Sequence, residues 1–155
     1  MKLLLAIDGS AHALQGVRWA LGLAAQGVAV EFVLINVQEP ASLYEVVTVH
    51  DAAVIEQVRG AAGADLLQPA EALLEAAGMG FESEVAGGAP EHLIVELAEN
   101  YGCDHIVMGA RGLGSPEEGG LGTVAQAVLE AATVPVTVVR QAGDAAAPVA
   151  GAEDQ

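Results

Sequence analysis

The sequence predicts a single α/β domain with a five-stranded parallel sheet and helices on both faces. Short apolar runs alternate with segments of helical character along most of the 155 residues, and this order requires crossovers between parallel strands. The first apolar run shows no polar alternation, as expected of a strand that is buried on both faces. Apolar residues make up 53% of the chain but aromatic residues only 3%, a composition that suits helices packed closely on a sheet.

Five apolar runs predict the strands, which in chain order are residues 2–8, 28–37, 80–85, 103–109 and 134–140. The first run is continuous and ends at Asp8, and the second ends in Ile35, Asn36 and Val37. The fourth contains the Ile-Val-Met segment 106–108, and the last alternates valines. Each run has the length typical of a strand in a parallel sheet.

Four intervening segments predict the helices, namely residues 12–26, 51–77, 90–100 and 122–132. The first ends before Gly27, a typical helix stop, and the third begins with Pro90, which is well placed in a first turn. In the second segment Gly60 and Gly63 weaken the helix, and we expect a kink or break at Gln68-Pro69 because proline cannot donate to the preceding turn. Residues 39–50 are expected to form a loop, or a lid.

The domain is expected to span residues 1–140, followed by a disordered acidic Ala/Gly/Pro tail at residues 141–155. No apolar run is long enough to cross a membrane, and Asp8 interrupts the N-terminal run too early for a signal peptide. The single cysteine, Cys103, excludes an internal disulfide and is expected to be a small buried residue. We therefore expect a cytoplasmic protein.

The charge balance excludes two classes of partner. The chain has 21 acidic and 5 basic residues, a net charge of −16. Such a surface repels nucleic acid and anionic membranes, so neither is expected to bind.

Two glycine-containing turns near the end of the chain carry the strongest chemical signal. Gly109 and Gly112 follow an apolar run, and Gly122 and Thr123 precede the last expected helix. Glycines let backbone N–H groups approach an anion, and a helix N-terminus favours phosphate because its N–H groups are available and its dipole end is positive. The segment predicts a nucleotide-phosphate site. In a chain with 19 glycines, unconstrained loop glycines are the equal alternative.

Two common phosphate-binding loops are excluded. A P-loop needs a Gly-Lys pair, and the only lysine is Lys2. The dinucleotide fingerprint should follow the first strand, which instead ends in Asp8, Gly9 and Ser10.

Several segments together resemble the universal stress protein family over residues 1–140. The matching segments are residues 3–10 (LLLAIDGS), 88–90 (GAP), 104–112 (DHIVMGARG), 122–123 (GT) and 134–140 (VPVTVVR). The glycine spacing G-x2-G-x9-G-[ST] after an I-V-M-G strand resembles the nucleotide-binding signature of that family. The resemblance implies a Rossmann-like sheet of order 3-2-1-4-5. In that order Asp8 and Gly109 end adjacent strands and flank one crevice.

The resemblance also implies an adenine nucleotide as ligand: ATP, or AMP or ADP, with Mg²⁺ accompanying the nucleotide. Backbone groups near Gly109, Gly112, Gly122, Thr123 and Val124 are expected to hold the phosphates. By resemblance, the base and sugar are expected to contact Ala6, Ile7, Val37 and Met108.

Two charged residues have alternative roles. Asp8 is expected to accept a hydrogen bond from the ligand or a metal ion, and the alternative is a turn-forming aspartate bonded to its own loop. Arg111 is the only cation of the phosphate segment. It reaches the phosphates or else pairs with Glu117 or Glu118, and the sequence favours neither.

The segment between Gly112 and Gly122 departs from the family pattern, because relatives often carry basic or apolar residues there. Glu117 and Glu118 disfavour a triphosphate unless a divalent cation bridges the charges. Binding is therefore expected to be weak, metal-dependent or specific for fewer phosphates. A second departure, Ala13 in place of a hydroxyl residue, is expected to remove only a hydrogen bond at the helix start.

Catalysis is poorly supported, and we expect at most slow ATP hydrolysis. Ser10 is not in a nucleophile elbow, and the histidines lack metal-ligand spacing. His12 is expected to face solvent, and Trp19 to serve in packing. Asp104 and His105 are expected to act only at a turn and an edge.

Residues 134–140 would be an edge strand with alternating apolar residues, Val134, Val136 and Val138, protected only by Pro135 and Arg140. The resemblance implies antiparallel dimerisation across this strand. Two functions remain: an ATP-binding, dimeric stress-response regulator with an unidentified protein partner, or a dimeric scaffold of the same fold that does not bind nucleotide.

Overall fold

The computed structural model describes residues 1–39, 52–112 and 120–141. Its strands are β1 (Lys2–Ala6), β2 (Glu31–Gln38), β3 (Phe81–Gly87), β4 (His105–Gly109) and β5 (Val136–Val139). Its helices are α1 (Ala11–Ala25), α3 (Ala52–Ala76), α4 (Pro90–Asn100) and α5 (Thr123–Ala131). The expected loop at 39–50 and tail at 141–155 lie outside these ranges, apart from Glu39 and Gln141.

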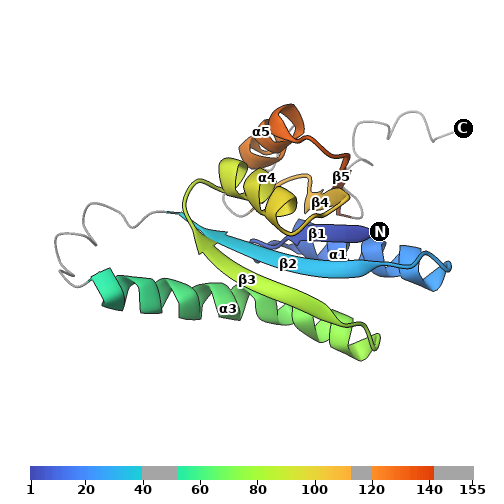
Figure 1. The fold of residues 1–155 in the computed structure, drawn as a ribbon, viewed down its shortest axis with the longest axis horizontal. Helices are drawn as coiled ribbons and strands as arrows, with labels where there is room; N and C mark the ends of the chain where they lie inside the picture. Colours follow the sequence, from blue (N-terminus) through green and yellow to red (C-terminus); the bar gives the residue numbers. More distant parts are fainter. Residues whose placement is uncertain (40–51, 113–119, 142–155) are drawn as a thin grey trace, which may run out of the picture.

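The strands form one parallel sheet of order β3-β2-β1-β4-β5, which confirms the predicted fold. Helices α1 and α3 cover one face, and α4 and α5 cover the other (Figure 1). Successive side chains of a strand point to opposite faces, so β1 supplies Leu3 and Leu5 to the α1–α3 layer and Leu4 to the α4–α5 layer. All three are at most 1% exposed, as the uninterrupted apolar run of β1 predicted.

Strands β2 and β4 begin later than the sequence predicted, because the helix that precedes each of them extends into the expected strand. The amide of Val28 donates to Leu23 O, so β2 begins at Glu31 rather than at 28. The amide of Cys103 donates to Ala98 O at the end of α4, so β4 begins at His105 rather than at 103. β1 ends at Ala6 and β5 spans Val136–Val139, both shorter than expected.

Pro69 does not break its helix, contrary to one of the two outcomes expected at Gln68-Pro69. Helix α3 continues through Pro69, which is exposed. Leu67 and Leu74, on either side, are 2% and 0% exposed. Burial of each leucine contributes about 1.5–3 kcal/mol, enough together to offset the ~3 kcal/mol cost of an interior proline. Because Pro69 faces solvent, water can also satisfy the carbonyl that it leaves unpaired.

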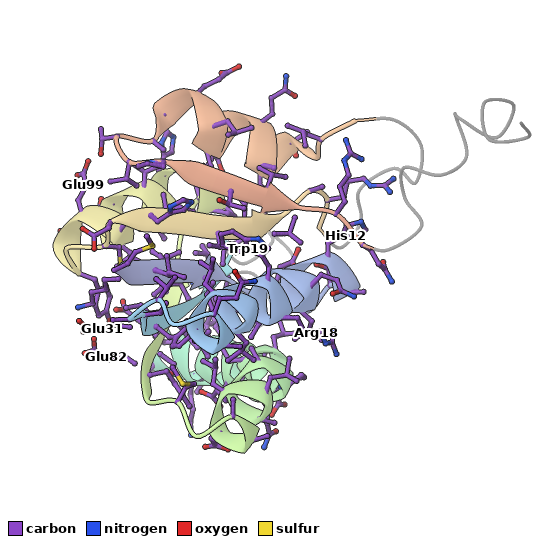
Figure 2. All side chains as sticks on the ribbon, turned by 90° about the vertical axis from the view of Figure 1, so that its right-hand side faces the viewer. His12, Arg18, Trp19, Glu31, Glu82 and Glu99 are labelled. Carbon is purple, nitrogen blue, oxygen red and sulfur yellow. The ribbon has the colours of Figure 1, made fainter. Side chains whose placement is uncertain are left out.

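Three residues that the sequence assigned to packing or turns do lie in such positions. Cys103 is 6% exposed, and burial raises the pKa of its thiol. Trp19, labelled in Figure 2, packs against the α1–α3 core. Its ring centroid lies 6.3 Å from that of the His105 imidazole. Asp104 accepts a hydrogen bond from the Lys2 amide at 2.8 Å, which joins the start of β4 to the start of β1.

Within the three described ranges, no helix meets the length and hydropathy that a membrane span requires.

Helix α3 approaches the sheet closely at Gly63. A Cβ at this position would collide with the Cγ1 of Val85 on β3 and would lie 2.8 Å from Asn36 Oδ1 on β2. Gly63 therefore allows α3 to pack against the sheet, although glycine lowers the helix propensity of this segment. Gly60, one turn earlier, has open space where its Cβ would be.

These two glycines give a matched test of the helix–sheet contact. Gly63→Ala is expected to lower the free energy of unfolding by about 1–3 kcal/mol, because the new methyl group overpacks a closely fitted interface. Gly60→Ala is expected to raise it by about 0.5–1 kcal/mol, because alanine is the better helix former and meets no obstacle. Urea denaturation followed by circular dichroism measures both. Equal effects of the two substitutions would contradict the close contact at Gly63.

Candidate functional site

A cavity of about 490 Å³ opens at the carboxyl ends of β1, β2 and β4. This is the edge of the sheet where the strand order reverses, because the connection that leaves β1 runs to β2 while β4 pairs on the other side. The residues predicted from the sequence to bind the nucleotide all line this cavity: Ala6, Ile7, Asp8, Val37, Met108, Gly109, Arg111, Gly112, Gly122, Thr123 and Val124. Segments distant in the sequence therefore meet in one place.

The two glycine turns are joined directly by the backbone. The amide of Gly122 donates to Ala110 O at 2.8 Å, and the amide of Ala110 donates to Val139 O at 2.8 Å. Gly122 is the N-cap residue of α5, and as a glycine it has no side chain to cap that helix start. The N–H groups in the first turn of α5 therefore lie at the cavity wall, beside the end of β4. This arrangement can hold an anion.

Gly109 and Gly112 allow approaches that no other residue would permit. A Cβ at Gly109 would lie 2.6 Å from the Cβ of His12 on α1. A Cβ at Gly112 would collide with Asp8 Oδ2. Packing against His12 and Asp8 therefore requires glycine at these two positions. Both glycines also line the cavity.

Asp8 combines a turn role with a position in the cavity. Its Oδ1 accepts a hydrogen bond from the Ser10 amide at 2.9 Å, which is the local turn bond considered as the alternative to ligand contact. Its other oxygen faces Gly112. Ser10 in turn caps α1, because its Oγ accepts from the Ala13 amide at 3.1 Å. The alanine at position 13 thus leaves the start of α1 capped.

The described part of the cavity wall carries few charges. Asp8 and Glu39 are its carboxylates, and Arg111 is the only lysine or arginine among the described lining residues. Arg111 is half-buried. Its expected alternative partners, Glu117 and Glu118, lie outside the described residues.

Several lining residues were missed by the sequence analysis. The most informative is Asn36, which is 1% exposed in the middle of an apolar strand. Its Nδ2 donates to Ile7 O at 2.8 Å, and its Oδ1 accepts from Gln38 Nε2 at 2.7 Å. A polar residue inside a buried strand must have partners, so Asn36 could have been found from its position in the apolar run. Nothing in the pattern indicated Gln38 or Leu66, the α3 residue of the wall.

Of the residues dismissed for catalysis, Ser10 lines the cavity, whereas His12 and His105 are not among its described lining residues. His12 is half-buried rather than solvent-facing, because its Cβ packs against Gly109. His105 Nε2 lies 2.6 Å from Thr137 Oγ1, in a contact between β4 and the edge strand, and burial lowers the pKa of its imidazole. In the described ranges, no three His, Cys, Asp or Glu side chains converge as a metal site.

Comparison with known proteins agrees with the fold. The model of the universal stress protein family matches residues 1–140. Universal stress protein YxiE of Bacillus subtilis is 32% identical over 147 residues, which cover 90% of this chain and 98% of that protein. Among solved structures, the hypothetical protein MJ0577 is similar with a TM-score of 0.77 at 25% identity, over 90% of this chain and 95% of that one. A universal stress protein in complex with cAMP is similar with a TM-score of 0.61 at 26% identity, over the same shares.

The family match over nearly the whole described domain and the identity to YxiE lead to one conclusion: this chain belongs to the universal stress protein family.

Proposed function

We propose that the protein binds an adenine nucleotide in this cavity and acts as a dimeric stress-response regulator. The observation that carries the proposal is the meeting of the β1 end with the late glycine turns around one cavity. ATP is the expected ligand, with AMP and ADP as smaller alternatives. In the regulator, nucleotide occupancy would change the segment between the glycine turns and so alter the binding of a protein partner.

The cavity offers different chemistry at its two ends. Around Gly109, Gly112 and Gly122 the wall is backbone, and the start of α5 supplies N–H groups that suit phosphate. Toward β2 the wall contains the apolar side chains of Ile35 and Val37, which suit a base. The structural relative in complex with cAMP supports an adenine nucleotide as the class of ligand.

A bulky residue at Gly122 tests the phosphate end. Gly122→Val is expected to weaken ATP binding in Mg²⁺ by at least about tenfold, because the branched side chain would shield the first N–H groups of α5 and a hydrogen bond to a charged group is worth ~1.5–3 kcal/mol. Isothermal titration calorimetry measures the dissociation constants. Gly120→Val is the matched control, since Gly120 has open space around its Cβ position and does not line the cavity.

The same titration separates the two candidate functions. If the wild-type protein binds neither ATP nor AMP, the nucleotide-independent scaffold replaces the proposed regulator. If the two valine variants bind equally well, the phosphates do not lie at the start of α5.

The low positive charge of the described cavity wall leads to a second prediction, which concerns ATP. Two carboxylates and one guanidinium in the described wall do not neutralise a triphosphate, whereas a divalent cation on the phosphates would. Removal of Mg²⁺ with EDTA is expected to weaken ATP binding by about tenfold, through unscreened repulsion in the partly enclosed site. AMP, with a single phosphate, serves as the control and is expected to bind equally with and without Mg²⁺. Metal-independent ATP binding in the same calorimetry would contradict this assignment.

Dimerisation is proposed through the free edge of β5. Ile106 N donates to Pro135 O and Ala110 N donates to Val139 O, so the odd-numbered residues of β5 bond to β4. The N–H and C=O groups of Val136 and Val138 therefore point to the free edge. Their side chains pack against the α4–α5 core, which means that the backbone, more than the valine side chains, is available for a second copy.

Val138→Pro tests this edge without disturbing β4 pairing. Proline removes one outward N–H group and is tolerated on an edge strand, so the variant is expected to sediment as a monomer in analytical ultracentrifugation. Val138→Ala shortens the side chain but keeps the N–H group, and it is expected to remain dimeric. Sedimentation of the proline variant as a dimer would show that β5 is not the interface.

A further inference from the structure

The β2 end of the cavity contains a hydrogen-bonded pair of amide side chains whose orientation is determined by the backbone. Asn36 and Gln38 lie two residues apart on β2, so both side chains point to the same face of the sheet, toward α3. Asn36 is 1% exposed, and both residues line the cavity. A buried amide of this kind requires defined partners.

The orientation of both amide side chains follows from the one group in this series of hydrogen bonds that cannot exchange its acceptor role for a donor role. The Ile7 carbonyl can only accept, so the Asn36 group facing it at 2.8 Å is the NH₂ group. Asn36 Oδ1 therefore faces Gln38, and the Gln38 group that contacts it at 2.7 Å must be a donor, Nε2. Gln38 Oε1 is then the acceptor that this side chain offers to a molecule in the cavity.

The position of Gln38 corresponds to the base of a nucleotide whose phosphates lie at the glycine turns. Those turns follow β4, and Gln38 ends β2, with β1 between the two strands. Neighbouring strands lie about 4.8 Å apart, so the two ends of the site are separated by roughly 10 Å. That separation is similar to the length of a nucleoside monophosphate, and it places the sugar near Asp8 and the base near Gln38.

We propose that Gln38 selects adenine by accepting a hydrogen bond from its exocyclic amine. Adenine presents an NH₂ donor at its six position, whereas guanine and hypoxanthine present a carbonyl oxygen there. An oxygen at that position would face Gln38 Oε1 with two acceptors and no proton between them. The Asn36 contact prevents Gln38 from rotating its amide to compensate. This inference rests on the proposed nucleotide site and names a residue that determines its specificity.

Glu39 is the competing acceptor at the same end of the cavity. Its carboxylate also lines the wall, but the residue is exposed. A solvated side chain loses more freedom when it binds a ligand than one already held in place, so Gln38, held by Asn36, is the better acceptor. Glu39 also provides a matched control for substitution.

The test compares AMP with IMP, two monophosphates whose bases differ in the six substituent and in the proton on the adjacent N1. Calorimetric titration of the full chain is expected to show about tenfold tighter binding of AMP, the value of roughly one well-placed hydrogen bond. Gln38→Met keeps the length of the side chain but removes its acceptor, and it is expected to equalise the two affinities mainly by weakening AMP binding. Glu39→Met removes the acceptor of the competing residue in the same way, and it is expected to keep the wild-type ratio. Thermal unfolding followed by circular dichroism confirms that each variant is folded.

The outcomes separate this inference from the proposed function. Equal binding of AMP and IMP by the wild type, or an unchanged ratio in Gln38→Met, overturns the role of Gln38 while the nucleotide site stands. Collapse of the ratio in Glu39→Met alone assigns the selection to Glu39 and also overturns it. Failure of the wild type to bind either nucleotide overturns the proposed function and the inference with it.

Discussion

Parallel pairing of β1 with β2 on one side and β4 on the other is the constraint on which the cavity depends. Ala6 lies opposite Ile35, and Leu5 lies opposite both Leu34 and Val107, so the three carboxyl ends reach the same edge of the sheet. The chain leaves β1 toward β2 and reaches β4 only after two further crossovers. The strand order therefore leaves no direct connection between β1 and β4, and the described side chains that end these strands surround a common space.

Close backbone approach, provided by glycine, gives this space its shape. Gly63 brings α3 against Val85 and Asn36, and Leu66, one turn further along α3, reaches the cavity wall. Gly112 brings the late turn against Asp8. A side chain at either position would push a wall of the cavity outward, since protein interiors have little free volume to absorb it. Packing and ligand chemistry thus place the same demand on these residues.

The polar groups of the site depend on one another more than on the solvent. Asn36 joins the Ile7 carbonyl at the end of β1 to the side chain of Gln38 on β2. Removal of the Asn36 or the Gln38 side chain would leave a buried polar group without its hydrogen bond, which costs about 1–3 kcal/mol. Few charges contribute: the chain as a whole is strongly acidic, but the described cavity wall carries only Asp8, Glu39 and Arg111, two negative groups and one positive group. Backbone groups and neutral amides therefore dominate the recognition that this cavity can offer.

The order of strands and helices and the glycine turns could be predicted from the amino-acid sequence, because apolar periodicity and turn residues act over a few neighbouring positions. Its resemblance to a family supplied the strand order and, with it, the convergence of Asp8 on Gly109. The continuation of α3 through Pro69 could not be predicted in this way, because burial of its neighbours against the sheet overcomes a local preference. Only the tertiary structure, likewise, brought Gln38 and Leu66 to the cavity wall. Their roles come from partners distant in sequence, and no local pattern records which segments the fold will bring together.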